Sequence, residues 1–180
     1  MHNKLNTSYK NLFPIGIILI LTLSRLIPHP PNFTPIIAVA IMSSYFFKNI
    51  YLSCATLLIS MLLADAFIGF YDNILFVYLS LFLIVFLFYK ISEKINFKNL
   101  FIYSFIGSII FFIISNFGVW ALGSPGILDI PYERNLNGLV ECYVLAIPFF
   151  PNTFLSTLIF AYPVIFIYKS LATWSRSRSR

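Results

Sequence analysis

Few residues in this 180-residue chain could do chemistry, and most of them stand at the edges of long apolar runs. Asp65 lies in the segment Leu-Leu-Ala-Asp-Ala-Phe, so its carboxylate is expected to be partly removed from water. A carboxylate in such a place is costly unless it has a partner. It could form a structural pair with Arg25, or it could meet a cationic or hydrogen-bonding ligand, and the sequence leaves both possibilities open.

A second group of candidates contains an amide, an indole and a thiol. Asn116 and Trp120 are four residues apart and therefore share one face of a helix. An amide beside an indole suits a planar heteroaromatic ligand, although Trp is also a common anchor at the membrane interface. Cys142 follows Glu141 and precedes Tyr143, so it is a weak candidate for a metal ligand and otherwise a packing residue.

Catalytic motifs are not evident in the sequence. The two histidines are His2 and His29, and neither belongs to a metal-binding or nucleophilic pattern. A glycine-rich phosphate loop is not found either, so ATP-driven work would need another chain. We expect a protein that is not an enzyme and holds no cofactor. An intramembrane enzyme using Cys142 is the weakest alternative.

The composition predicts the class of fold that must position these residues. With 59% hydrophobic and 10% charged residues, the chain is too apolar for a soluble domain of its length. Its apolar runs are longer than barrel strands. We expect an all-α integral membrane protein with six transmembrane helices in one domain over residues 1–170, followed by a basic Ser/Arg tail at 171–180. The six predicted helices are Leu12–Ile27, Pro35–Phe47, Ile50–Ala64, Ile74–Tyr89, Leu100–Trp120 and Phe154–Tyr168.

A proline-rich connector, Arg25–Pro35, separates the first two apolar runs. Its four prolines remove N–H donors and exclude a continuous helix. The run that follows covers only about two-thirds of a hydrocarbon core, so the connector is expected to dip below the surface. His29, Asn32 and Thr34 would then line a watery cavity. The alternative is a stiff turn outside the membrane.

Lys48 and Asn49 interrupt the apolar sequence that follows the connector. A single helix over Pro35–Ala64 would place Lys48 near the middle of the bilayer, at a cost of roughly 2.5–3.5 kcal/mol. We therefore predict two helices joined by a tight turn.

The distribution of charge predicts the orientation of the bundle. Ten of the twelve basic residues fall on one side, which the positive-inside rule makes cytoplasmic together with both termini. The net charge of +6 therefore indicates topology and does not suggest nucleic-acid binding. The expected location is a bacterial inner membrane. The ten basic residues are Lys4, Lys10, Lys48, Lys90, Lys94, Lys98, Lys169, Arg176, Arg178 and Arg180.

The long segment before the last helix completes the predicted outer surface. Leu136–Ile147 is apolar, with Asn137 and Glu141 on one helical face, which predicts a short interfacial or re-entrant helix that Pro148 ends. It would lie over the outer mouth. A one-sided set of polar residues favours an outward-facing pocket, although loops are polar in any case. The expected ligand-binding residues are His29, Asn32, Thr34, Asp65, Asn116, Trp120, Glu141, Tyr143 and Asn152.

Three segments carry a resemblance to a known family: Arg25–Pro35, Ser115–Trp120 and Gly138–Thr153. They resemble a family of short, uncharacterised bacterial membrane proteins described as candidate transport proteins. That family is similar to the substrate-binding S components of energy-coupling-factor transporters. The resemblance implies six helices, a loop-built site at the outer mouth for a vitamin or metal, and partnership with a scaffold subunit and ATPases.

One feature departs from the S components. Their first helix often carries an Ala-x-x-x-Ala face that docks the scaffold, and the first run here has none. Ala40 and Ser44 are the nearest substitute. We therefore expect uptake of a small micronutrient, with a scaffold or alone. The alternative is an accessory subunit of a larger membrane complex, with its aromatic-rich outer surface as an interface.

Overall fold

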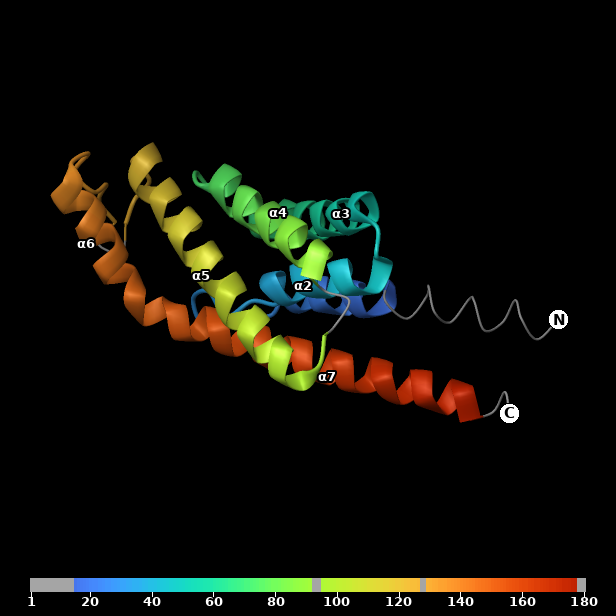
Figure 1. The fold of residues 1–180 in the computed structure, drawn as a ribbon. Coiled ribbons are helices and arrows are strands. Elements are labelled where there is room, and N and C mark those ends of the chain that lie inside the picture. Colours follow the sequence, from blue (N-terminus) through green and yellow to red (C-terminus); the bar gives the residue numbers. More distant parts are fainter. Residues whose placement is uncertain (1–14, 92–94, 127–128, 178–180) are drawn as a thin grey trace.

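The computed structural model describes residues 15–91, 95–126 and 129–177, and every regular element in these ranges is helical (Figure 1). A first helix covers Ile15–Ser24. The helices that follow are α2 (Ile36–Phe47), α3 (Ile50–Ile68), α4 (Ile74–Ile91), α5 (Phe97–Leu122), α6 (Leu136–Ala146) and α7 (Phe150–Ser177), with a short 3-10 helix, η2 (Ile147–Phe149), between the last two.

Four stretches in the described part of the chain are long and apolar enough to cross a membrane. They are α3, α4, α5 and the continuous segment Leu136–Leu171, which joins α6, η2 and α7. This confirms the apolar, all-helical character predicted from composition. The first helix as described, and α2, are shorter. Four of the six predicted spans therefore correspond to long apolar helices. The crossing of the membrane by the first helix and α2 stays a prediction.

The two ends of the bundle differ in the residues they carry. We call the end where α3 ends and α4 begins the Asp65 end, and the end where α2 meets α3 the Lys48 end. The first described helix begins, and α7 ends, at the Lys48 end (Figure 1). The described chain therefore crosses the bundle an even number of times.

Helix α2 forms the centre of the bundle. All nine residues from Ile36 to Ser44 are buried, and the helix packs against α3, α4, α5 and α7. Small residues at its surface allow close approach: the Ser44 Oγ donates to the Val85 carbonyl oxygen of α4 at 3.1 Å, and the Ser53 Oγ of α3 donates to the Ser43 carbonyl oxygen at 3.1 Å. An apolar helix without a polar face is expected to be surrounded in this way.

The burial of α2 corrects one interpretation of the sequence. Ala40 and Ser44 were the nearest substitute for a scaffold-docking face, but both side chains have no exposed surface. They hold α2 against its neighbours, so they are not available to a partner. Any docking surface for a scaffold must lie elsewhere.

The break between α2 and α3 confirms the two-helix prediction. Lys48 ends α2 in the left-handed region with φ of 48°. Asn49 then caps α3, because its side-chain oxygen accepts from the backbone N–H groups of Tyr51 and Leu52 at 2.9 and 3.1 Å. The break thus places Lys48 at the end of the bundle.

Helix α5 pairs with α6 and α7 in antiparallel fashion along its length. Near its end the Tyr143 hydroxyl donates to the Ile113 carbonyl oxygen at 2.7 Å, and near its start the Phe97 ring stacks on Tyr162. The short helix α6 was predicted to lie over the outer mouth, but it runs beside α5 and continues through η2 into α7 (Figure 1). Pro148 does not end the helical path because it occupies a first-turn position of η2, where its N–H is not needed.

Candidate functional site

A buried ion pair lies near the Asp65 end, between the first helix, α3 and α4. The Arg25 Nη2 donates to the Asp65 Oδ1 at 2.8 Å, and the Tyr78 hydroxyl donates to the Asp65 Oδ2 at 2.8 Å. Asp65 has no exposed surface, whereas the Arg25 side chain is 9% exposed. Both carboxylate oxygens are thus occupied by donors. The structural Arg25–Asp65 pair that the sequence allowed is confirmed.

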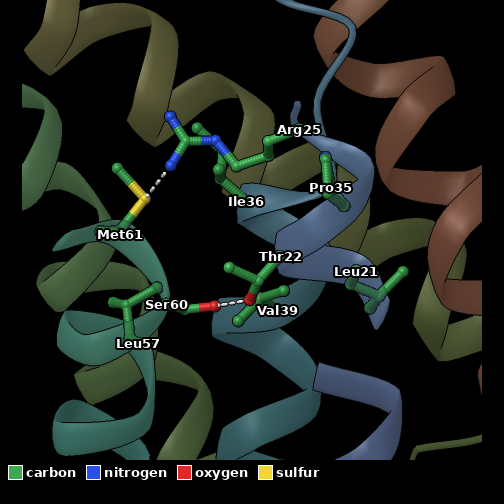
Figure 2. A pocket seen from close by; sticks show the side chains of 9 residues that line it. All are labelled: Leu21, Thr22, Arg25, Pro35, Ile36, Val39, Leu57, Ser60 and Met61. Atoms are coloured by element: carbon green, nitrogen blue, oxygen red, sulfur yellow. Dashed lines mark hydrogen bonds between the residues drawn. The ribbon is translucent and has the colours of Figure 1, made fainter. Parts of the chain in front are cut away.

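Local structure explains how Arg25 reaches Asp65. The first helix and α3 run side by side in the same direction, so that Thr22 meets Ser60 and Arg25 meets Asp65. Arg25 follows the helix in a turn in which its N–H donates to the Thr22 carbonyl oxygen at 3.2 Å. Its side chain extends across Ile36 to Met61, whose sulfur accepts from the Arg25 Nη1 at 3.3 Å (Figure 2).

Tyr71 lies between α3 and α4, close to this pair. Burial, together with the negative charge of Asp65, raises the pKa of the Tyr71 hydroxyl above its ordinary value. Tyr71 therefore remains neutral at physiological pH. Arg25 and Asp65 are the charged members of the cluster.

A small cavity adjoins the Arg25 guanidinium (Figure 2). Its volume is about 10 Å³, which is close to the minimum for one water molecule. The Arg25 Nε is buried and has no hydrogen-bond acceptor. In this conformation the cavity is thus too small for a vitamin. Its lining consists of Leu21, Thr22, Arg25, Pro35, Ile36, Val39, Leu57, Ser60 and Met61.

The proline connector reaches into the bundle. Pro35 and Ile36 line the cavity with Ser60, about two turns before the end of α3. On the α7 side, the Asn152 Nδ2 donates to the Pro31 carbonyl oxygen at 3.0 Å. Three of the predicted ligand-binding residues stand on this segment: His29 and Asn32 are exposed, and Thr34 is half-buried. The end of the connector is therefore buried among the helices, and its depth relative to the membrane surface stays a prediction.

The indole of α5 contacts the loop before α6, and the neighbouring amide bonds within α5. The Trp120 Nε1 donates to the Glu133 carbonyl oxygen at 3.0 Å, and the Asn116 Nδ2 donates to the Phe112 carbonyl oxygen at 2.7 Å. The Cys142 Sγ donates to the Asn116 carbonyl oxygen at 3.4 Å. Cys142 and Tyr143 therefore join α6 to α5, and Trp120 joins α5 to the loop before α6. The Asn116 side chain bonds within its own helix. Glu141 is exposed and lies apart from these contacts.

The predicted site residues are therefore divided among three places: Asp65 in the ion pair, the connector with Asn152, and the α5–α6 contact. Sequence reasoning missed Tyr78, although a tyrosine within the apolar sequence of α4 was a signal for it. Within the described ranges, no three His, Cys, Asp or Glu side chains gather, so these residues do not assemble a metal site around Cys142.

One protein family matches residues 5–179, and it is described as a family of unknown function, DUF6580. The chain belongs to this family. No curated protein and no solved structure matches it. The match to DUF6580 covers nearly the whole chain and confirms that it is a member of a family without an assigned function. The link to S components stays a prediction.

The α5–α6 contact of this DUF6580 protein depends on a helix cap that can be tested. The Asn135 side-chain oxygen accepts from the Gly138 N–H at 2.8 Å and caps α6. We expect Asn135→Ala to lower the free energy of unfolding by about 1 kcal/mol. The measurement is thermal unfolding of the purified protein. Asn137→Ala is the matched control, because Asn137 is exposed within α6; equal effects of the two substitutions would contradict the role of the cap.

Proposed function

We propose that this protein is a membrane-embedded binding subunit that takes up a small micronutrient, which enters from the Asp65 end. The observation that carries the proposal is a buried, incompletely satisfied arginine beside a non-helical connector. Ionisable residues inside a membrane are costly, and they typically mark substrate or ion pathways.

The connector supports a water-filled vestibule at this end. Non-helical backbone at membrane depth is tolerated where protein buries it or where it lines an aqueous cavity. His29 and Asn32 are exposed, while Pro35 at the end of the same segment is buried next to Ser60. Water that reaches the connector would bring a polar ligand to Arg25.

The charge pattern supports an outward orientation of this vestibule. Lys48, Lys90 and Lys169 lie toward the opposite end, at or near the ends of α2, α4 and α7. By the positive-inside rule the Lys48 end faces the cytoplasm, with both termini, and the Asp65 end faces outward. In a bacterial inner membrane this orientation serves uptake.

The uptake function resembles that of S components, which work with a scaffold subunit and ATPases. Because Ala40 and Ser44 are buried, a scaffold would have to bind another surface. A stripe along α6 provides one apolar candidate, since Val140, Val144 and Ile147 are 54%, 55% and 58% exposed. In the absence of a scaffold this stripe faces the lipid bilayer.

Native mass spectrometry of the purified protein tests the proposal. We expect a small molecule to co-purify, or at least one member of a vitamin and metal panel to raise the melting temperature. Arg25→Gln should remove this effect, whereas Arg134→Gln should retain it because Arg134 is exposed at the same end. A protein that binds no member of the panel, and carries no small molecule, would contradict the proposal.

The second candidate function is that of an accessory subunit of a larger membrane complex. It is favoured by the exposed apolar stripe of Val140, Val144 and Ile147, which belongs to a helical path that contacts α5. Stable co-purification of a large membrane partner would support it. Assembly should then survive the double substitution Arg25→Met with Asp65→Leu, which removes the ion pair without leaving a buried charge, because neither side chain is part of the stripe.

A further inference from the structure

The guanidinium of Arg25 has more donors than its surroundings accept. One N–H meets the Asp65 carboxylate, another meets the weakly accepting Met61 sulfur, and the buried Nε has no acceptor. The side chain is 9% exposed, so bulk water does not compensate fully. Arginine is well suited to hold a carboxylate with two parallel hydrogen bonds. Here it holds Asp65 with one.

The N-terminus of α2 meets Arg25 at the same cavity. Pro35, Ile36 and Val39 belong to its lining, and no side chain caps the helix. The Val39 N–H makes the first bond of the helix, to the Pro35 carbonyl oxygen at 2.8 Å. The N–H groups before it have no acceptor within the helix, and the helix dipole places about half a positive charge there. This end of α2 therefore favours an acceptor or an anion.

Charge balance decides how an anion can be held. Arg25 and Asp65 cancel, and the helix adds about half a positive charge, so the site is weakly positive. A carboxylate that arrived alone would make this buried site negative. A carboxylate that arrives with one proton leaves the balance unchanged.

We propose that Arg25 and the N-terminus of α2 bind the carboxylate group of the ligand. Asp65 takes up one proton when the ligand binds, and Arg25 then separates from Asp65 and pairs with the ligand carboxylate. In this step a proton passes from water to an Asp65 oxygen. The Arg25–Asp65 ion pair is replaced by an ion pair between Arg25 and the ligand. The cavity has room for about one water molecule, so Arg25 must turn from Met61 as the carboxylate enters. This inference rests on the proposed function and names its substrate class.

The side chains that face Asp65 are consistent with the uptake of one proton by Asp65 when the ligand binds. Arg25 approaches from the first helix, Tyr78 from α4 and Tyr71 from the segment between α3 and α4. The titratable side chain of α2 is Tyr45, which is at the other end of that helix, beside Tyr168. The neutral Tyr78 hydroxyl can donate to a carboxylate or accept from a protonated Asp65. Asp65 is therefore the acid that faces Arg25.

The test compares acids with their amides on the full chain in lipid nanodiscs. Benzoate and nicotinate are the probes, and benzamide and nicotinamide are the neutral controls. We expect the acids to bind with an apparent Kd that falls about tenfold for each pH unit from about pH 8 to about pH 6, because one proton is linked to binding. In a weakly buffered solution, about one proton should be taken up per bound acid.

Variants separate the two roles. Asp65→Asn should bind the acids without pH dependence or proton uptake, and Arg25→Gln should not bind them. Asp72→Asn should behave as the wild type, because Asp72 is an exposed acid at the same end. If Asp65→Asn does not fold, binding of the acids to the wild-type protein without proton uptake still refutes the inference.

Three results would overturn this inference: equal binding of the amides, binding of the acids without proton uptake, or an Asp65→Asn variant with the pH dependence of the wild type. Failure of the acids while other small molecules bind would refute the inference and leave the proposed uptake function standing. If neither these acids nor the vitamin and metal panel binds, both proposals fail.

Discussion

Replacement of Arg25 by methionine is expected to lower the free energy of unfolding by about 3–5 kcal/mol. The substitution keeps the apolar stem of the side chain but leaves the Asp65 carboxylate without a cation in a fully buried position. Tyr78 still donates one hydrogen bond, which does not compensate for the charge.

The double variant Arg25→Met with Asp65→Leu is the informative control. Because it removes both charges together, it should recover most of the lost stability, as apolar replacement of a buried ion pair often does. Asp72→Leu should have a small effect, because Asp72 is exposed. The measurement is thermal unfolding of each variant in detergent, with a double-mutant cycle. A double variant as unstable as Arg25→Met would show that the pair does not act as a unit.

Ser44→Leu is expected to destabilise the protein by about 1–3 kcal/mol through overpacking, with further loss from the hydrogen bond to Val85. Ser44 has no exposed surface, and its Oγ donates to the Val85 carbonyl oxygen at 3.1 Å. A leucine there would push α2 away from α4. We expect a lower melting temperature and easier cleavage by protease in the segment between α2 and α3.

The control for this variant is Ser170→Leu, because Ser170 is exposed near the Lys48 end. It introduces the same side chain on the outer surface of α7 and should leave the melting temperature nearly unchanged. If Ser44→Leu were equally harmless, the central position of α2 would be refuted. Scaffold docking through the Ala40–Ser44 face would then become a possibility again.

Much of the fold could be predicted from the sequence because apolar length and helix breakers are local properties. The four prolines before α2 and the Lys48–Asn49 break mark helix ends without reference to any distant residue. The Arg25–Asp65 pair was predictable for a related reason, since two charges within apolar runs each need a partner.

The arrangement of the predicted site residues could not be derived in the same way. Asn116 and Trp120 were expected to face a shared pocket with Asp65, but the Asn116 side chain bonds within α5 and Trp120 bonds to the loop before α6. Which helix faces meet depends on crossing angles and on the course of α6 past Pro148. Neither is encoded in spacing along one helix. The sequence did not predict a role for Tyr78, because that role depends on a hydrogen bond to Asp65 in the neighbouring helix α3.

The enclosure of α2 has a consequence for biosynthesis. Four of the helices that surround it, namely α3, α4, α5 and α7, leave the ribosome after it. A 12-residue helix is about 18 Å long, which is too short to be inserted stably across a bilayer on its own. We therefore expect α2 to become fully covered only when the later helices are in place, and a chain truncated before α7 would leave it incompletely covered.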